Sequence, residues 1–223
     1  YFHPERDIRV IAHVDDFLCT GDEVQMDWLY KELSLEYDLK VQKVSGDSRH
    51  NQEAKFLNRT IRVTEEGIQV KGDEKHAQIL LREWGMENCK GLDNPVGAKV
   101  KEVLEEKIPM DPDDAWKCRR GTARVNYMAQ DRPDLGVAAK MLSQSMADPQ
   151  IGDEVSLKRV IRYLKSFPER ISHLYFQEAE PPLVIMSDSD WAGNEETRKS
   201  TSGGLVRYGG HLISHWCKTQ ATV

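Results

Sequence analysis

The order of hydrophobic patterns along the chain constrains its fold more than any other feature. Short alternating or β-branched runs at residues 8–14, 17–19, 55–63 and 67–71 predict strands, and so do three runs after residue 183. Segments with helical periodicity separate them, two in the first half and three between about residues 113 and 164. Strand-rich regions on both sides of a run of helices predict an α+β fold.

Prolines divide this pattern into three segments. Residues 94–112 contain Pro95, Pro109 and Pro112 together with a charged stretch at 99–107, as expected for a linker. A second change of pattern follows Pro181 and Pro182, where helices give way to strands. The sequence therefore predicts segments at residues 1–93, 94–182 and 183–223.

Composition narrows the class of protein. The 223 residues are 39% hydrophobic and 30% charged, without an apolar run of the roughly 18 residues that a membrane span needs. We therefore expect an intracellular protein with no membrane partner. The four cysteines form no C-x-x-C pair, so neither a zinc cluster nor a disulfide framework is indicated. The net charge of −6 argues against one basic surface covering the whole molecule.

Basic residues nevertheless concentrate in one region. Residues 117–170 carry 11 Lys or Arg and 6 Asp or Glu. This excess suits an anionic partner, but the solvated faces of amphipathic helices would give the same pattern.

Two groups of carboxylates are candidate metal ligands. Asp15 and Asp16 interrupt an apolar run and would lie at the tip of a hairpin, where they repel each other unless water or a cation surrounds them. Asp188 and Asp190 follow a strand and, two residues apart, would face the same side. Magnesium or manganese suits such oxygen ligands, whereas an exposed turn is the plainer interpretation of the first pair.

The loop after the second pair has a phosphate-binding composition. Residues 198–204 combine cations, hydroxyls and glycines, with Arg198, Lys199 and Ser200 as the candidate contacts. A calcium-binding EF-hand is excluded here, because Ala192 and Lys199 stand where that loop needs oxygen ligands.

Five ordered motifs resemble the Pol polyprotein of copia-type retrotransposons, from the middle of the reverse transcriptase into ribonuclease H. Residues 13–16 resemble its Y-x-D-D turn and 55–61 its F-L-G-x-x-I hairpin, which holds the primer end. Residues 130–135 and 157–165 resemble its R-P-D and K-R-x-x-R-Y-L-K motifs. The most specific match joins D-x-D-W-A-G at 188–193 to R-K-S-T-S-G at 198–203.

The resemblance implies a fold and a role for each segment. Residues 1–93 would be a partial reverse transcriptase palm and thumb, 94–182 a helical connection and 183–223 the opening of a ribonuclease H-like sheet. Catalytic metal ligands would be Asp15, Asp16 and Asp188, with Asp190 a weaker candidate. The implied contacts with an RNA/DNA template-primer duplex are Phe56, Leu57, Arg132, Lys158, Arg159 and Arg162.

The resemblance also implies Mg²⁺ or Mn²⁺ as cofactor and the remainder of Pol as partner. The implied location is either a virus-like particle in the cytoplasm or the nucleus. His13 and Asn58 depart from the family's Tyr and Gly. The family supplies further metal ligands from segments upstream and downstream of the part that residues 1–223 resemble. We therefore expect negligible activity from this chain in isolation. The alternative is a non-catalytic nucleic-acid binder or a degenerate relic of a retroelement.

Overall fold

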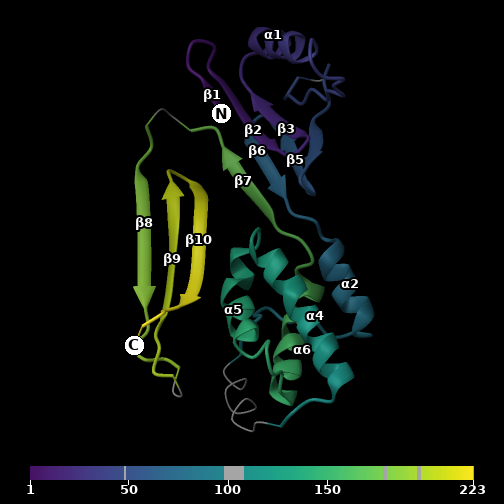
Figure 1. Ribbon diagram of the computed structural model, residues 1–223, viewed down its shortest axis with the longest axis vertical. Helices are drawn as coiled ribbons and strands as arrows, with labels where there is room; N and C mark the ends of the chain where they lie inside the picture. The colour runs from purple at the N-terminus through teal and green to yellow at the C-terminus, as the bar shows by residue number, and fades with distance from the viewer. Residues whose placement is uncertain (48, 98–107, 178–179, 195–196, 223) are drawn as a thin grey trace. The chain divides into compact units, whose positions relative to one another are not determined.

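The computed structural model describes residues 1–47, 49–97, 108–177, 180–194 and 197–222 (Figure 1). The predicted charged stretch at 99–107 lies outside these ranges. The chain forms two compact units, residues 1–65 and 66–223. Helices and antiparallel sheets occur together, which confirms the predicted α+β class. No helix among the described residues is long and apolar enough to cross a membrane.

The smaller unit contains a three-stranded sheet, a helix and a hairpin. Strands β1 (Phe2–His3), β2 (Ile8–His13) and β3 (Asp16–Thr20) are antiparallel in the order β1-β2-β3. Helix α1 (Glu23–Leu33) follows β3, at one of the segments predicted to be helical, and none of its residues is fully buried. The hairpin of β2 and β3 with an acidic tip is therefore confirmed.

The second hairpin corrects one prediction from the strand pattern. That pattern predicted one strand over residues 55–63, but β4 (Glu53–Phe56) and β5 (Arg59–Val63) form two antiparallel strands, as the resemblance of residues 55–61 to a hairpin implied. Between them Leu57 and Asn58 have φ values of 49° and 61°. Two residues with positive φ make the tight turn that suits twisted strands, and Asn tolerates that backbone better than most residues.

Helices form the core of the larger unit. They are α2 (Lys75–Glu83), α4 (Pro112–Ala129), the 3₁₀ turn η1 (Pro133–Leu135), α5 (Gly136–Gln144) and α6 (Ile151–Ser166). Helix α6 lies at the centre and packs against the other three (Figure 1). Its buried apolar face meets theirs in one cluster, which includes Leu80, Val125, Leu135, Leu142, Leu157, Ile161 and Leu164.

Local chemistry sets the helix ends. The Asp111 side chain accepts a hydrogen bond from the Asp113 amide at 3.0 Å, with Pro112 in the first turn of α4. At the start of α6, the Asp153 carboxylate accepts from the Gln150 amide at 2.8 Å. Helix α2 stops before Gly85, whose φ of 63° is a left-handed C-terminal cap.

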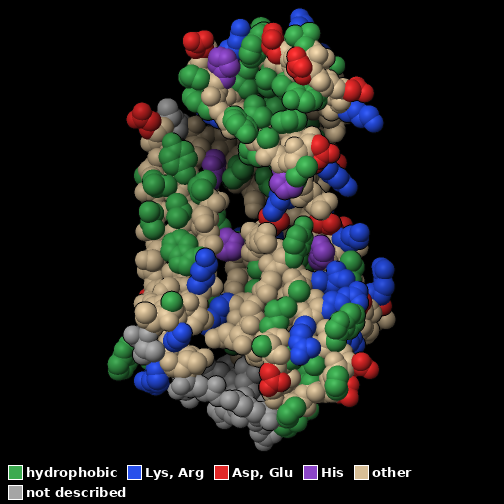
Figure 2. All heavy atoms as spheres, in the orientation of Figure 1, with side chains coloured by type: hydrophobic (Ala, Val, Ile, Leu, Met, Phe, Trp, Pro, Cys, Tyr) green, Lys and Arg blue, Asp and Glu red, His purple; other side chains and the backbone are tan. Residues whose placement is uncertain are grey.

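Two further sets of strands complete the larger unit. Strand β6 (Gly67–Lys71) pairs with β7 (Ile171–Tyr175), which the sequence pattern did not predict. Strands β8 (Leu183–Ser189), β9 (Thr201–Tyr208) and β10 (His211–Thr219) form an antiparallel sheet in the order β10-β9-β8, which confirms the three predicted C-terminal strands. Hydrophobic side chains are visible across one face of this sheet (Figure 2).

A buried arginine ties η1 to the end of α6. Arg132, 6% exposed, donates to both carboxylate oxygens of Asp134 at 2.7–3.1 Å and to the Phe167 carbonyl at 3.1 Å. The Tyr163 hydroxyl donates to the same carboxylate at 2.8 Å. Charged groups at this depth persist because each is paired and hydrogen-bonded.

This network shifts two pKa values. Burial alone would raise the pKa of Asp134, but the hydrogen bonds and charge of Arg132, with the Tyr163 hydroxyl, outweigh it and hold that pKa below its ordinary value of 3.8. The pKa of Tyr163 is raised by burial and by its bond to Asp134. The ionised Asp134 is therefore the form that stabilises the fold.

We expect Asp134→Asn to lower the free energy of unfolding by about 2–3 kcal/mol at pH 7, because it leaves the Arg132 charge buried without a counter-ion. A depressed folded-state pKa contributes stability above the unfolded value, and that stability is lost as the pH falls through the folded value. The difference between wild type and variant should therefore shrink below about pH 4. Urea denaturation followed by circular dichroism measures it, with Asp93→Asn, an exposed position, as control. A difference independent of pH would contradict this role.

Candidate metal and nucleic-acid sites

The first candidate site is the turn between β2 and β3. His13 pairs with Asp16 across the hairpin, so Val14 and Asp15 are the two turn residues. Asp15 and Asp16 are both exposed, and neither makes an ion pair or a side-chain hydrogen bond with the described part of the chain. Two adjacent carboxylates without protein partners can accept a hard cation from solvent.

Backbone strain accompanies this turn. Val14 has a φ of 56°, is 89% exposed and is β-branched, which makes the left-handed conformation unfavourable. Such a conformation costs on the order of 1–3 kcal/mol and tends to occur at functional positions. The surrounding hairpin imposes it here, because the β2–β3 register leaves only two residues for the turn.

The second acidic group lies at the end of β8 in the larger unit. Asp188 is exposed, and its carboxylate accepts from the Ser189 amide at 2.9 Å. Asp190 lies beyond the strand, which ends at Ser189. The expectation that both residues share one strand face is therefore wrong for Asp190.

Asp190 instead organises the loop that follows. One carboxylate oxygen accepts from the Thr201 amide at 2.7 Å and the Gly193 amide at 3.2 Å. These hydrogen bonds lower the pKa of Asp190, and the bond from the Thr201 amide has the largest effect. A carboxylate that closes a loop in this way has less capacity for a metal than Asp188.

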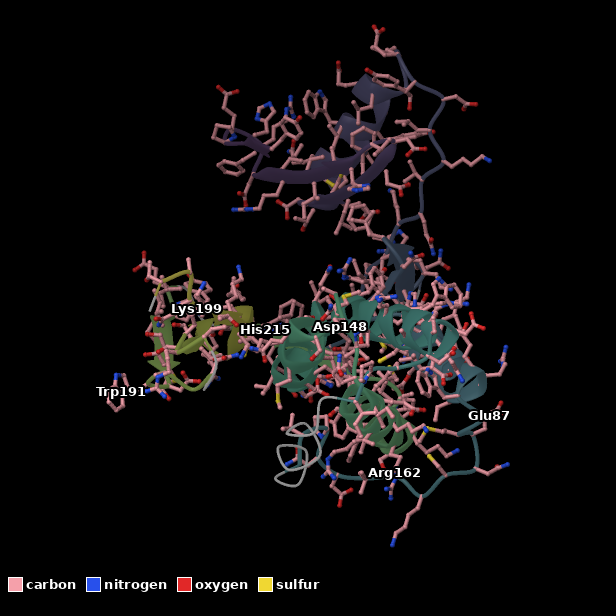
Figure 3. All side chains as sticks on the ribbon, turned by 60° about the horizontal axis from the view of Figure 1, so that its bottom comes forward. Glu87, Asp148, Arg162, Trp191, Lys199 and His215 are labelled. Carbon is pink, nitrogen blue, oxygen red and sulfur yellow. The ribbon has the colours of Figure 1, made fainter. Side chains whose placement is uncertain are left out.

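The predicted phosphate contacts lie at the far side of the same loop. The Ser200 hydroxyl accepts a hydrogen bond from the Ala192 amide at 3.0 Å, so it stabilises the loop itself. Arg198 is exposed, and no hydrogen bond or ion pair joins its guanidinium to the described residues; Lys199 is half-buried. Trp191, 92% exposed, extends outward from this end of the sheet (Figure 3).

The basic side chains of α6 contact the protein itself. Lys158 forms an ion pair with Glu154 at 2.5 Å, and Arg162 donates to the Lys90 carbonyl at 2.8 Å. Arg159 packs so closely on Gly97 that a Cβ there would lie 2.6 Å from its guanidinium carbon. Arg159 and Arg162 therefore hold the segment before residue 98 against α6, whereas the ion pair of Lys158 lies within the helix.

Three other predicted contacts differ in their surroundings. Phe56 and Leu57 are half-buried at the turn of the β4–β5 hairpin. Arg132 is buried and bonded to Asp134, so its guanidinium is not exposed to a nucleic-acid partner. Its R-P-D motif has a structural explanation.

A groove between the helices and the β8–β10 sheet was missed by the sequence pattern. It encloses about 720 Å³ and is lined by residues of α4, α5 and β10. Its walls come from positions 126–144 and 213–219, which carry no common motif. Only the packing of α5 beside β10 brings them together.

The described residues contain no group of three or more His, Cys, Asp or Glu side chains placed to hold a metal ion. The acidic positions are thus pairs at most. The fold and these positions define the class of protein: a mixed α+β segment with exposed carboxylates at a hairpin turn and at a strand end.

Known proteins resemble this chain over nearly its whole length. It is 30% identical over 217 residues to the mitochondrial protein AtMg00810 of Arabidopsis thaliana, covering 96% of this chain and 84% of that protein. It is 30% identical to the retrovirus-related Pol polyprotein from transposon RE2 and 28% identical to that from transposon RE1, both of A. thaliana, over 97% of this chain. No protein-family model matches the chain, and no solved structure is significantly similar to it.

The chain belongs to the copia-type retrotransposon Pol polyproteins and their relatives. It spans 14% of the length of each of the two transposon polyproteins.

We expect Val14→Gly to stabilise the β2–β3 hairpin by about 1 kcal/mol, because relief of left-handed strain exceeds the added entropy of the unfolded chain. Hydrogen exchange of the β2 and β3 amides should then slow roughly fivefold. The matched control Val10→Gly, within β2, should accelerate exchange instead. Faster exchange in Val14→Gly would show that the turn is not strained.

Proposed function

We propose that this chain is the segment of a retrotransposon Pol polyprotein that supplies carboxylates for RNA-directed DNA synthesis and for ribonuclease H cleavage. In this proposal residues 1–93 belong to a palm and thumb, 94–182 to a helical connection and 183–223 to the opening of a ribonuclease H-like sheet. The relationship to Pol polyproteins over 97% of the chain supports it.

One structural observation carries the proposal: Asp15, in the β2–β3 turn, and Asp16, the first residue of β3, are both exposed, and neither side chain has an ion-pair or hydrogen-bond partner among the described residues. Mg²⁺ or Mn²⁺ would fit this donor set, since Mg²⁺ is held by one or two carboxylates and completes its shell with waters and substrate phosphates. When bound, such an ion neutralises charge that develops on phosphate oxygens. Asp188 would serve the ribonuclease H side, while Asp190 positions the loop beside it.

The proposal includes a limit on activity. A two-metal reaction needs a convergent set of ligands, and no group of three or more such side chains occurs among the described residues. These residues alone therefore hold a cation weakly and position it poorly.

A second candidate function is nucleic-acid binding without catalysis. The exposed guanidinium of Arg198, which has no partner among the described residues, favours it. A phosphate contact from this residue would give salt-dependent affinity regardless of base sequence.

The two functions differ in their dependence on divalent ions. At matched ionic strength, we expect an RNA–DNA hybrid to bind on the order of tenfold more tightly with Mg²⁺ than with EDTA, the scale of one charge-assisted contact. Asp15→Asn should lose most of this gain, whereas Asp38→Asn, the same charge change at an exposed position, should keep it. Fluorescence anisotropy measures both. Equal gains in the two variants would refute a metal-bridged contact and leave the non-catalytic function.

For the isolated chain we expect negligible primer extension on an RNA template with Mg²⁺, because the ligand set is incomplete. Incorporation of labelled nucleotides measures it, with a complete reverse transcriptase as positive control. Extension that disappears in Asp15→Asn would disprove the predicted inactivity while supporting the assignment of the turn.

A further inference from the structure

The groove between α5 and β10 has the size of a binding cleft. Its volume of about 720 Å³ falls within the roughly 300–1,000 Å³ typical of ligand sites. The hollow between the helices and the sheet is visible in Figure 2, and His215 lies on its sheet side in Figure 3. Its polar lining includes Asn126, Gln130, Lys140, Ser143, Gln144 and His215.

The charge of this lining contrasts with that of the whole chain. None of the described residues that line the groove is Asp or Glu, although 37 of the 223 residues of the chain are. Lys140 is the cation among them. An anion in the groove would thus meet the charge of Lys140 and no lining carboxylate, which favours its entry, although Asp190, outside the lining, is near enough for Lys140 to lower its pKa.

Several polar groups of the lining are unused. Asn126 and Ser143 bond to each other at 2.8 Å, but the side chains of Gln130, Gln144 and His215 form no hydrogen bond with the described residues. Lys140 donates one bond, to the Thr201 hydroxyl at 2.8 Å, and has two further N–H groups. The groove therefore offers amide donors and acceptors next to a cation.

We propose that this groove binds an unpaired stretch of nucleic acid, with Lys140 on a phosphate and Gln130 and Gln144 on base edges. The inference rests on the proposed function, since a Pol segment works on nucleic acid, and it names a site that the acidic turns do not include. The Watson–Crick edges of bases can reach such amides only when unpaired, because in a duplex the complementary strand occupies those edges. One phosphate contact beside amides that hydrogen-bond these edges therefore suits a short single strand.

The test uses the full chain and fluorescent ten-residue oligouridylate and oligothymidylate. Lys140→Ala should weaken binding about fivefold or more and reduce the slope of log affinity against log salt by about 0.7, the value for one phosphate contact in a single strand. Gln144→Ala should weaken binding without changing that slope. Lys31→Ala, an exposed lysine of α1, should change neither by as much.

Two controls separate a contact from a loosened fold. Thr201→Val removes the bond between α5 and β9 but keeps the lysine, so it should retain the salt slope. Alkylation of Cys217, which lines the groove, should slow when the oligonucleotide binds, whereas that of half-buried Cys89, outside the groove, should not.

The proposal is overturned if Lys140→Ala behaves like Lys31→Ala or if the oligonucleotide leaves Cys217 unprotected. Protection of Cys217 that rises with protein concentration alone would assign the groove to a second copy of the chain. If the unmodified chain does not bind the single strands but still binds the hybrid in a Mg²⁺-dependent way, this inference is refuted and the proposed function stands.

Discussion

The larger unit depends on one buried cation. Arg132 donates hydrogen bonds to the Asp134 carboxylate and to the carbonyl of Phe167, the residue that follows α6. The Tyr163 hydroxyl donates a further hydrogen bond to the same carboxylate. An uncompensated charge at 6% exposure would cost several kcal/mol, so η1 and the end of α6 are fixed together. Strand β7 begins a few residues later and pairs with β6, so the network also fixes where the chain leaves the helices.

Patterns within single elements were predictable. The apolar periodicity of the helices follows from the face that each buries in the core cluster, and the apolar runs after residue 183 form the three strands β8, β9 and β10. The acidic tip of the first hairpin was predictable for the same reason, since two Asp residues interrupt two apolar runs.

Features that depend on distant residues were not predictable. The burial of Arg132 needs Tyr163, which lies 29 residues beyond Asp134, and a basic residue in a basic segment otherwise suggests a surface contact. The strand pattern did not locate the turn at Leu57 and Asn58, because no glycine or proline marks it; the positive φ values of the two residues do. The same holds for Asp190, whose bond to Thr201 spans 11 residues.

The candidate sites depend both on local sequence patterns and on contacts between distant residues. The acidic turn is encoded locally and is then held in a strained conformation by strand register, which keeps both carboxylates exposed. The groove beside α5 has no local code at all, yet its lining is free of carboxylates among the described residues. A Pol segment that combines an exposed acidic turn with a groove without lining carboxylates would suit the proposed substrate, whose charge lies on its phosphates.

The central claim is that the carboxylates of the β2–β3 turn hold a divalent cation. Iron(II) with ascorbate and peroxide, in place of Mg²⁺, generates hydroxyl radicals that cut a polypeptide close to the bound metal. Our account predicts cuts concentrated around residues 13–17, suppressed by excess Mg²⁺ and absent from the double variant Asp15→Asn and Asp16→Asn. Cuts distributed without regard to this turn, or unchanged in the double variant, would contradict it.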